Sequence, residues 1–139
     1  MVGPDATAAQ RRSPGRPVRA GRQFRRGDVF LADLPDAAGT AKSGVRPVVV
    51  IQNDTGNRMG GTVIVATITS RQSSRPYPVN VALPPKLLSR ASEVRASQIH
   101  TLDKDMFGTR IAHLSRSVMA RVDEAIGVSL GLPRNREGR

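Results

Sequence analysis

The stretch Gly44-Val45-Arg46-Pro47-Val48-Val49-Val50-Ile51-Gln52-Asn53-Asp54 places one arginine at the start of the most apolar strand that the sequence predicts. Pro47 restricts the backbone of Arg46 to extended conformations, so the guanidinium is held at the rim of a sheet. A guanidinium is rarely buried without a partner, and its planar set of five N–H donors matches a phosphate group. Arg46 is therefore a candidate phosphate-binding residue. The alternative is a strand-end cation that pairs with a nearby carboxylate.

The composition is that of a globular protein of one domain, with 139 residues and no cysteine. The absence of cysteine excludes a disulfide framework and a thiolate metal site. No apolar run approaches the roughly 20 residues that a membrane-spanning helix requires, and the N-terminus lacks the apolar segment of a secretory signal. We therefore expect a cytoplasmic protein.

The net charge of +11 is concentrated at the two ends of the chain. Residues 1–26 hold seven arginines and one acid, a net +6, and residues 133–139 contribute a net +2. The segment 27–132 carries only +3. Basic tails attract polyanions without reading their sequence. Because residues 1–25 have almost no large apolar side chains, we expect them to form a disordered basic tail, and residues 133–139 to form a second basic tail.

Six segments of alternating or β-branched sequence predict strands. Two long loops are expected at residues 35–45 and Asn53–Gly61, because both are rich in small and turn-forming residues. The predicted strands are Val29–Leu34, Arg46–Gln52, Thr62–Thr69, Pro78–Leu83, Glu93–Ile99 and Thr109–Leu114, with a short turn at Asp103–Met106.

One helix is predicted after the last strand. Ser115 is a suitable N-cap, and apolar or small residues recur at helical spacing from Val118 to Ser129. Gly131 and Pro133 end the helix. A series of strands followed by one terminal helix predicts a mainly β protein, a small and partly open β-barrel with a C-terminal helix.

The sequence offers little support for metal or nucleotide chemistry. His100 and His113 lie in different predicted strands, and the acids show no spacing that would gather several carboxylates. We expect His113, which lies between two apolar residues, to be a packed and hydrogen-bonded structural residue. No glycine-rich phosphate loop precedes a helix, which excludes nucleotide binding of the P-loop type. We expect neither a metal nor a cofactor.

Arg46 and Thr69 are predicted to be neighbours in space. If residues 46–52 and 62–69 form an antiparallel hairpin, the start of the first strand lies beside the end of the second. A cation and a hydroxyl then meet at one rim of the sheet, where Gln98 would add a donor and an acceptor. For Thr69 and Gln98, ordinary strand-end hydrogen bonding is the alternative.

Several separated motifs along the chain stand in the same order as in a known protein family, and no gap is needed to align Gly27 to Arg71 with it. They are Arg26-Gly27-Asp28-Val29-Phe30 with Asp33-Leu34, Gly39-Thr40, Gly44 to Asp54, Gly56-Asn57-Arg58, Thr62 to Ser70, Gln98 to Lys104, Ile111 to Leu114, and Val122 to Ile126 with Leu130-Gly131-Leu132. Together they resemble the MazF/PemK family of toxin endoribonucleases. The resemblance covers about residues 25–132 and assigns residues 26–132 to a toxin domain.

The resemblance implies a homodimeric SH3-like barrel that cleaves single-stranded RNA, often at short sequence motifs and without a metal. It also implies the toxin of a type II toxin–antitoxin system, which inhibits translation and growth. The implied partner is a cognate MazE-like antitoxin whose disordered acidic tail lies across the RNA groove. The net +3 barrel and the basic tails suit such a segment electrostatically.

The resemblance also implies roles for five residues. The family's catalytic arginine and threonine fall on Arg46 and Thr69, and its RNA-contacting residues fall on Thr40, Asn53 and Gln98. Thr40 stands where the family has a serine, which keeps the hydroxyl. The residues that follow, Ala41-Lys42-Ser43, replace the family's Glu-Gln-Gly in a loop that meets RNA. This difference removes an acid and adds a cation where phosphate should pass.

In the implied reaction the ribose 2′-hydroxyl attacks the adjacent phosphorus, leaving a 2′,3′-cyclic phosphate and a 5′-hydroxyl. Arg46 suits the stabilisation of charge on the non-bridging oxygens. Arg46 stays protonated and Thr69 is no strong base, so the sequence does not identify the proton acceptor. Because the nucleophile belongs to RNA, DNA should not be cut.

Two other functions stay open. A CcdB-type toxin shares the barrel and poisons DNA gyrase by binding, but the intact pair of Arg46 and Thr69 argues against it. A basic nucleic-acid-binding module is the third possibility. Aromatic residues make up only 3% of the chain, which argues against stacking platforms for bases.

Overall fold

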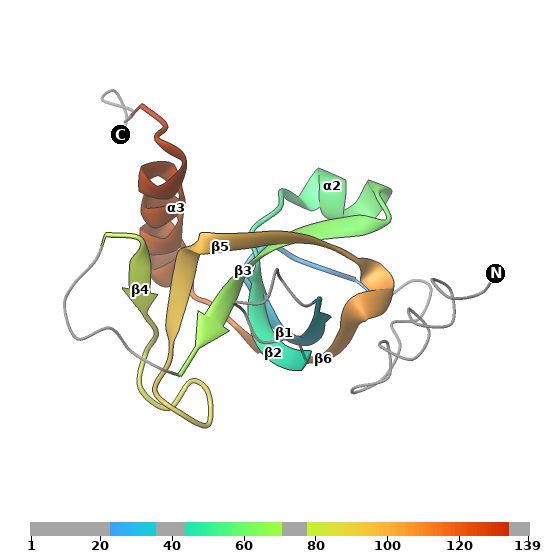
Figure 1. The fold of residues 1–139 in the computed structure, drawn as a ribbon, viewed down its shortest axis with the longest axis horizontal. Coiled ribbons are helices and arrows are strands. Elements are labelled where there is room, and N and C mark those ends of the chain that lie inside the picture. Colours follow the sequence, from blue (N-terminus) through green and yellow to red (C-terminus); the bar gives the residue numbers. More distant parts are fainter. Residues whose placement is uncertain (1–22, 36–43, 71–77, 134–139) are drawn as a thin grey trace.

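One antiparallel sheet of six strands dominates the computed structural model, which describes residues 23–35, 44–70 and 78–133. The strand order across the sheet is β4-β5-β3-β2-β1-β6, so β4 and β6 form its edges. The sheet curls without closing, and the C-terminal helix α3 packs against β4 and β5 (Figure 1). The predicted mainly β fold, a partly open barrel with a C-terminal helix, is confirmed. Of the predicted tail over residues 1–25, residues 1–22 lie outside the described residues.

The observed strands match the predicted segments, with differences of up to four residues at their ends. β3 has the predicted bounds, whereas β5 runs four residues beyond the predicted end. The elements are β1 (Asp28–Leu34), β2 (Gly44–Val50), α2 (Asp54–Met59), β3 (Thr62–Thr69), β4 (Asn80–Ala82), β5 (Glu93–Asp103), the 3₁₀ helix η1 (Lys104–Met106), β6 (Phe107–His113) and α3 (Arg116–Leu130).

The prediction of a loop over Asn53–Gly61 is wrong, because the short helix α2 occupies most of it. Asn53 caps this helix: its Oδ1 accepts a hydrogen bond from the backbone N–H of Gly56 at 2.7 Å. Asn57, in the middle of the helix, is buried. Asparagine and aspartate favour both turns and helix starts, because their side chains bond nearby backbone N–H groups. The residue types alone therefore did not distinguish the two structures.

The two faces of the sheet bury two separate apolar clusters, because successive strand residues point to opposite faces. Val49 of β2 belongs to the cluster that α3 covers, whereas Val48 and Val50 belong to the other. We call this second set the inner cluster, and the face that carries it the inner face. The buried members of the inner cluster are Phe24, Phe30, Ala32, Leu34, Val48, Val50, Val63, Val65, Leu102 and Phe107.

Both ends of α3 are capped as the sequence predicts. Ser115 accepts a hydrogen bond from the backbone N–H of Val118 at 3.2 Å. At the other end Gly131 has φ +72°, a left-handed conformation that glycine adopts without steric cost. No helix within the described residues is long and apolar enough to cross a membrane.

Three phenylalanine rings pack together in the inner cluster. The Phe24 ring centroid lies 4.9 Å from the centroids of both Phe30 and Phe107, and the latter two are 5.4 Å apart. Tilted and edge-to-face pairs of this kind are favourable. Phe24 is only 4% exposed, so the packed core includes a residue that precedes the predicted start of the domain at Arg26.

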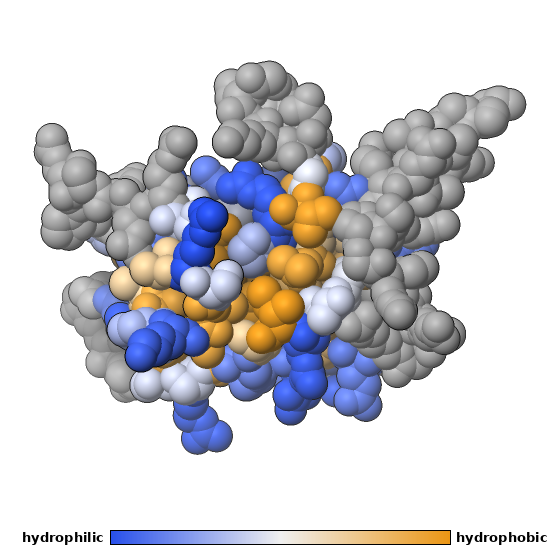
Figure 2. All heavy atoms as spheres, turned by 90° about the horizontal axis from the view of Figure 1, so that it is seen from below, coloured by the Kyte–Doolittle hydropathy of each residue, from blue (hydrophilic) through white to orange (hydrophobic). Residues whose placement is uncertain are grey.

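Apolar side chains also gather on part of the surface. Seen from below the view of Figure 1, an apolar area lies among hydrophilic side chains (Figure 2). Such areas on soluble proteins often mark contacts with other proteins. The large apolar residues exposed in the described part of the chain are Val45, Met59, Ile111, Val128, Leu130 and Leu132.

Candidate active site

Arg46 and Thr69 lie on neighbouring antiparallel strands, as the hairpin argument predicts. The register of β2 and β3 pairs Val48 with Thr67 and Val50 with Val65. Continued by two residues along each strand, the same register sets Arg46 opposite Thr69. Opposite Cβ atoms of an antiparallel pair are about 4.5–5.5 Å apart. The topology therefore supports the predicted meeting of a cation and a hydroxyl.

Both residues belong to the inner face. Arg46 is two residues before Val48, and Thr69 follows Val65 by four residues, so strand alternation directs all four side chains to the same side. Beyond Val48 and Val65 the apolar packing of the inner cluster gives way to polar side chains. Arg46 and Thr69 are both partly buried there. A partly dehydrated cation stabilises a phosphate more strongly than one in bulk water.

Gln98 is brought to the same face by an irregularity in β5. The register of β3 with β5 shifts between Ala66 and Thr67, so that Thr67 pairs with Arg95. At this irregularity the Oγ1 hydroxyl of Thr67 donates a hydrogen bond to Oε1 of Gln98 at 2.8 Å. The Gln98 amide group is thereby oriented, and its N–H₂ group makes no hydrogen bond to a described residue. Thr67 is thus a site residue that sequence reasoning missed.

His100 is a second residue that the sequence did not assign to this face. It pairs with Val65 of β3, a member of the inner cluster, and is two residues from Leu102, another member. Partial burial lowers the pKa of His100 below its usual value, and the positive charge of Arg46 lowers it further. The charge of Arg46 therefore acts on His100, although burial is the larger cause of the lowered pKa. Strand alternation, which places His100 on the face that also carries Arg46, was the sequence signal available for finding this residue.

A carboxylate also lies beside Thr69. Glu93 pairs with Thr69 in the β3–β5 register, and its side chain is only 8% exposed. Its Oε2 lies 3.3 Å from a guanidinium nitrogen of Arg95. The negative charge is thereby compensated, as a buried carboxylate requires. Glu93 and Arg95 are two residues apart on β5 and therefore share a face. Only the place of this ion pair beside Thr69 depends on the register between β3 and β5, which the sequence did not give.

Asn53 lies at the opposite end of β2 from Arg46. Seven residues separate them, a span of about 20 Å in extended chain. The side chain of Asn53 caps α2, and the residue is exposed. The structure therefore does not bring Asn53 together with Arg46 and Thr69 in this chain. Thr40, the remaining predicted RNA-contacting residue, lies outside the described residues.

The capping role of Asn53 leads to a testable expectation. Asn53→Ala should lower the free energy of unfolding by about 1 kcal/mol, because the N–H of Gly56 loses its acceptor. Asn53→Asp keeps a capping oxygen and should leave stability nearly unchanged. Urea unfolding of both variants checks this. Equal losses for the two substitutions would show that the cap contributes little.

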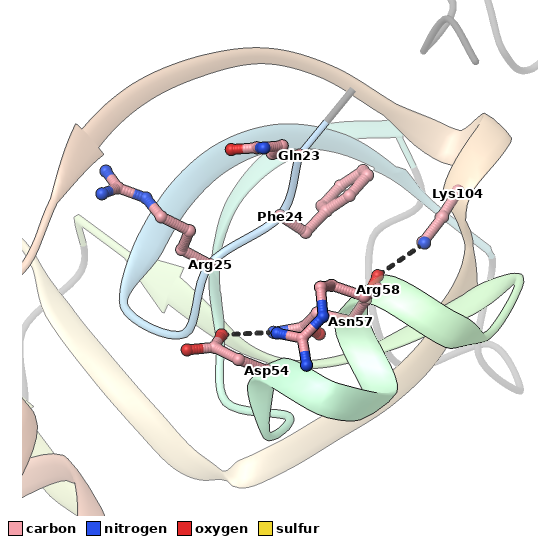
Figure 3. Close-up of a pocket in the computed structure, with 7 residues that line it drawn as sticks. All are labelled: Gln23, Phe24, Arg25, Asp54, Asn57, Arg58 and Lys104. Carbon is pink, nitrogen blue, oxygen red and sulfur yellow. Dashed lines mark hydrogen bonds between the residues drawn. The ribbon is translucent and has the colours of Figure 1, made fainter. Parts of the chain in front are cut away.

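A pocket of about 460 Å³ lies beside α2. Figure 3 shows the Phe24 ring directed toward Lys104, whose ammonium lies 5.4 Å from the ring centroid. Lys104 also donates a hydrogen bond to the backbone carbonyl of Asn57 at 2.6 Å. None of the predicted site residues that the structure describes lines this pocket, so we do not place the chemistry there. Its lining residues are Gln23, Phe24, Arg25, Asp54, Asn57, Arg58 and Lys104.

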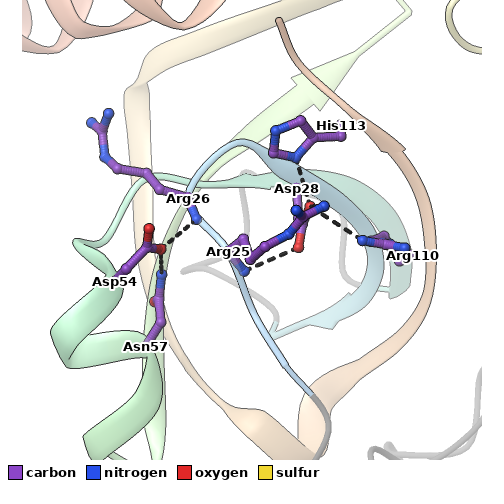
Figure 4. Close-up of polar contacts among 7 residues, drawn as sticks. All are labelled: Arg25, Arg26, Asp28, Asp54, Asn57, Arg110 and His113. Atoms are coloured by element: carbon purple, nitrogen blue, oxygen red, sulfur yellow. Dashed lines mark hydrogen bonds and ion pairs between the residues drawn. The ribbon is translucent and has the colours of Figure 1, made fainter. Parts of the chain in front are cut away.

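A polar network near this pocket stabilises the start of β1. Asp28 is buried, and its Oδ1 lies 2.7 Å from Nδ1 of His113 (Figure 4). The guanidinium groups of Arg25 and Arg110 each lie 3.6 Å from the same oxygen. His113 is therefore hydrogen-bonded to a buried carboxylate, in keeping with the structural role expected, although its side chain is 44% exposed. Asp28 and its partners tie β6 to β1.

A second carboxylate joins the N-terminal segment to α2. The backbone N–H of Arg26 donates to Oδ1 of Asp54 at 2.8 Å, and this bond lowers the pKa of Asp54 (Figure 4). The Arg26 guanidinium also lies 2.6 Å from Oδ1 of Asp123 on α3. Among the described residues, no group of three or more histidine or acidic side chains is placed to hold a metal ion.

Comparison with solved structures identifies similar folds. An endoribonuclease from Mycobacterial species has a TM-score of 0.69 and 26% sequence identity, covering 84% of this chain and 100% of that chain. An endoribonuclease in complex with its cognate antitoxin, also from Mycobacterial species, has a TM-score of 0.66 and 28% identity, covering 80% and 98%. MazF from Deinococcus radiodurans has a TM-score of 0.68 and 26% identity, covering 80% and 99%.

The family resemblance proposed from the sequence motifs is confirmed by an independent match. Residues 25–130 match the family described as PemK-like, MazF-like toxin of type II toxin–antitoxin system. The matched range includes Arg46, Thr69, Gln98 and His100. The chain therefore belongs to the PemK-like, MazF-like toxins of type II toxin–antitoxin systems.

Proposed function

We propose that this toxin is an endoribonuclease that cleaves single-stranded RNA at the inner face, through attack of a ribose 2′-hydroxyl on the adjacent phosphorus. The products are a 2′,3′-cyclic phosphate and a 5′-hydroxyl. The observation that carries the proposal is the β2–β3 register, which pairs Val48 with Thr67. Extended by two residues along each strand, this register would set Arg46 opposite Thr69. Similar solved structures that are described as endoribonucleases support the proposal.

Each side chain contributes a separate part of the chemistry. The Arg46 guanidinium stabilises the charge that develops on the non-bridging phosphate oxygens. The Thr69 hydroxyl binds the phosphate or orients the nucleophile, because it can both donate and accept. Gln98, oriented by Thr67, presents its amide N–H₂ group to an RNA base or ribose. The cation that stabilises the transition state belongs to the protein and the nucleophile to the substrate, so the reaction requires no metal.

A cleavage assay with labelled single-stranded RNA tests this function. The purified protein should cut RNA equally well with excess EDTA and with Mg²⁺, and the products should carry cyclic phosphate and 5′-hydroxyl ends. A DNA strand of the same sequence should stay intact, because it lacks the 2′-hydroxyl. Strict dependence on a divalent ion, or cleavage of the DNA strand, would contradict the proposed reaction.

The proposed protein partners are a second copy of the chain and an acidic antitoxin. Related solved structures described as MazE–MazF, from Deinococcus radiodurans, support an antitoxin partner. The apolar surface area in Figure 2 is a feature typical of protein–protein contacts. The net +3 charge of residues 27–132 favours an acidic segment. Loss of cellular RNA through cleavage would inhibit translation and growth.

A further inference from the structure

The proposed reaction needs a group that removes the proton from the 2′-hydroxyl. Arg46 stays protonated at any ordinary pH, so it cannot serve as the base. The Thr69 hydroxyl is no strong base either. On the inner face of β5, the carboxylate of Glu93 and the imidazole of His100 can hold a proton. Asp28 of β1 and His113 of β6 also belong to this face by strand alternation, but they are hydrogen-bonded to each other. The choice between Glu93 and His100 follows from their surroundings.

The carboxylate of Glu93 already forms an ion pair with Arg95. Its side chain is 8% exposed, and its carboxylate lies 3.3 Å from the Arg95 guanidinium. To act as a base it would have to give up this compensation while almost inaccessible to substrate. A buried carboxylate held by a guanidinium serves better to position Arg95 and the strand around Thr69.

His100 is open to a substrate. Its side chain is only partly buried, and neither ring nitrogen makes a hydrogen bond to a described residue. His113 differs, because its Nδ1 is 2.7 Å from the buried Asp28 carboxylate. In the β3–β5 pairing His100 is opposite Val65. The next residue of β3 on the inner face is Thr67, which donates a hydrogen bond to Gln98. His100 therefore lies between the apolar inner cluster and the polar rim that carries Arg46.

The electrostatic setting keeps His100 in the form that a base needs. Partial burial and the charge of Arg46 both lower the pKa of His100 below about 6.5, its usual value. The imidazole is then neutral at pH 7 and can accept a proton. The ionisable groups that strand alternation and pairing set on this face with His100 come from four strands: Arg46 from β2, Glu93 and Arg95 from β5, Asp28 from β1, and Arg110 and His113 from β6. The inner-face residues of β3, which are Val63, Val65, Thr67 and Thr69, are not ionisable.

We propose that His100 is the general base of RNA cleavage, accepting the 2′-hydroxyl proton directly or through one water molecule. This inference rests on the proposed function and adds a catalytic residue to it. The O–H bond of the 2′-hydroxyl breaks and its proton moves to an imidazole nitrogen. The oxygen electron pair forms the bond to phosphorus, and the bond from phosphorus to the 5′-oxygen breaks. The departing oxygen takes a proton from water, and the imidazolium neutralises the resulting hydroxide.

The pH dependence of cleavage tests this assignment. For the wild-type protein, the single-turnover rate constant should fall as pH drops through a value below about 6.5, where His100 becomes protonated, and should be flat above it. His100→Gln should lower the rate at pH 7.5 by about 100-fold or more and remove the inflection. His113→Gln is the matched control, because it changes the other histidine, and it should retain the inflection.

Two further measurements separate catalysis from structure. Urea unfolding and binding of a DNA analogue of the substrate report whether His100→Gln still folds and binds. In His100→Ala, added imidazole should partly restore cleavage, because a free base can occupy the vacated space. A residue that acts only through packing would show no such rescue.

The possible outcomes are distinguishable. If the folded His100→Gln protein cleaves at the wild-type rate, or keeps the inflection, His100 is not the base, although the endoribonuclease function stands. An inflection that disappears in His113→Gln instead would also overturn the assignment. If the wild-type protein does not cleave RNA under any condition, the proposed function itself fails.

Discussion

Arg46→Ala should reduce RNA cleavage by roughly two to three orders of magnitude, the usual cost of removing a positioned donor that stabilises developing negative charge. The loss should appear in the single-turnover rate constant, because the phosphate charge is greatest in the transition state. The fold should survive, since Arg46 lies beyond the inner cluster and is only partly buried. Cleavage kinetics at saturating protein, together with urea unfolding, measure the two effects separately.

Arg121→Ala is the control for the loss of a positive charge. Arg121 is an exposed residue of α3, so its removal changes the net charge equally without touching the inner face. It should leave the rate constant within about twofold of wild type, because exposed charges at a distance are largely screened. If Arg46→Ala behaved like Arg121→Ala, the catalytic role of Arg46 would be refuted.

Phe107→Ala should lower the free energy of unfolding by about 3–5 kcal/mol, the range for truncating a large buried aromatic residue. Phe107 is 1% exposed and its ring packs against both Phe24 and Phe30. The loss is a large part of the roughly 5–15 kcal/mol that stabilises a typical domain. Urea unfolding followed by circular dichroism provides the measurement.

Met59→Ala is the matched control for removal of an apolar side chain. Met59 ends α2 and is 78% exposed, so its truncation should change stability by no more than about 0.5 kcal/mol. Phe107→Leu, which retains much of the buried volume, should fall between the two. A Phe107→Ala protein as stable as Met59→Ala would show that the three phenylalanines do not form a cooperative core.

The regular elements were predictable where one local signal dominated. β3 was predicted with its observed bounds, because Thr62–Thr69 is β-branched almost throughout and no turn residue interrupts it. α3 was predicted because Ser115 and Gly131 mark its ends and apolar residues recur between them. α2 was missed, because Asn53 and Asp54 favour a turn and a helix start equally well.

The candidate site was predicted only in part. The hairpin argument anticipated that the strands of Arg46 and Thr69 pair antiparallel, which brings the start of one beside the end of the other. Thr67, Glu93 and His100 were not anticipated. Their places depend on the register between β3 and β5, and on the shift in that register after Ala66. Strand alternation gives each residue a face only when the position of such a shift is known.

The sequence by itself determined the succession of strands along the chain, the terminal helix, the antiparallel pairing of the strands that carry Arg46 and Thr69, and the family to which the chain belongs. These depend on local patterns, whose physical causes act over a few residues. The tertiary structure decided that Asn53 caps a helix, that Phe24 joins the core, and that His100 shares a face with Arg46. Such contacts join residues far apart in the chain, and only the packed sheet sets their register, their burial and the electrostatic field that they share.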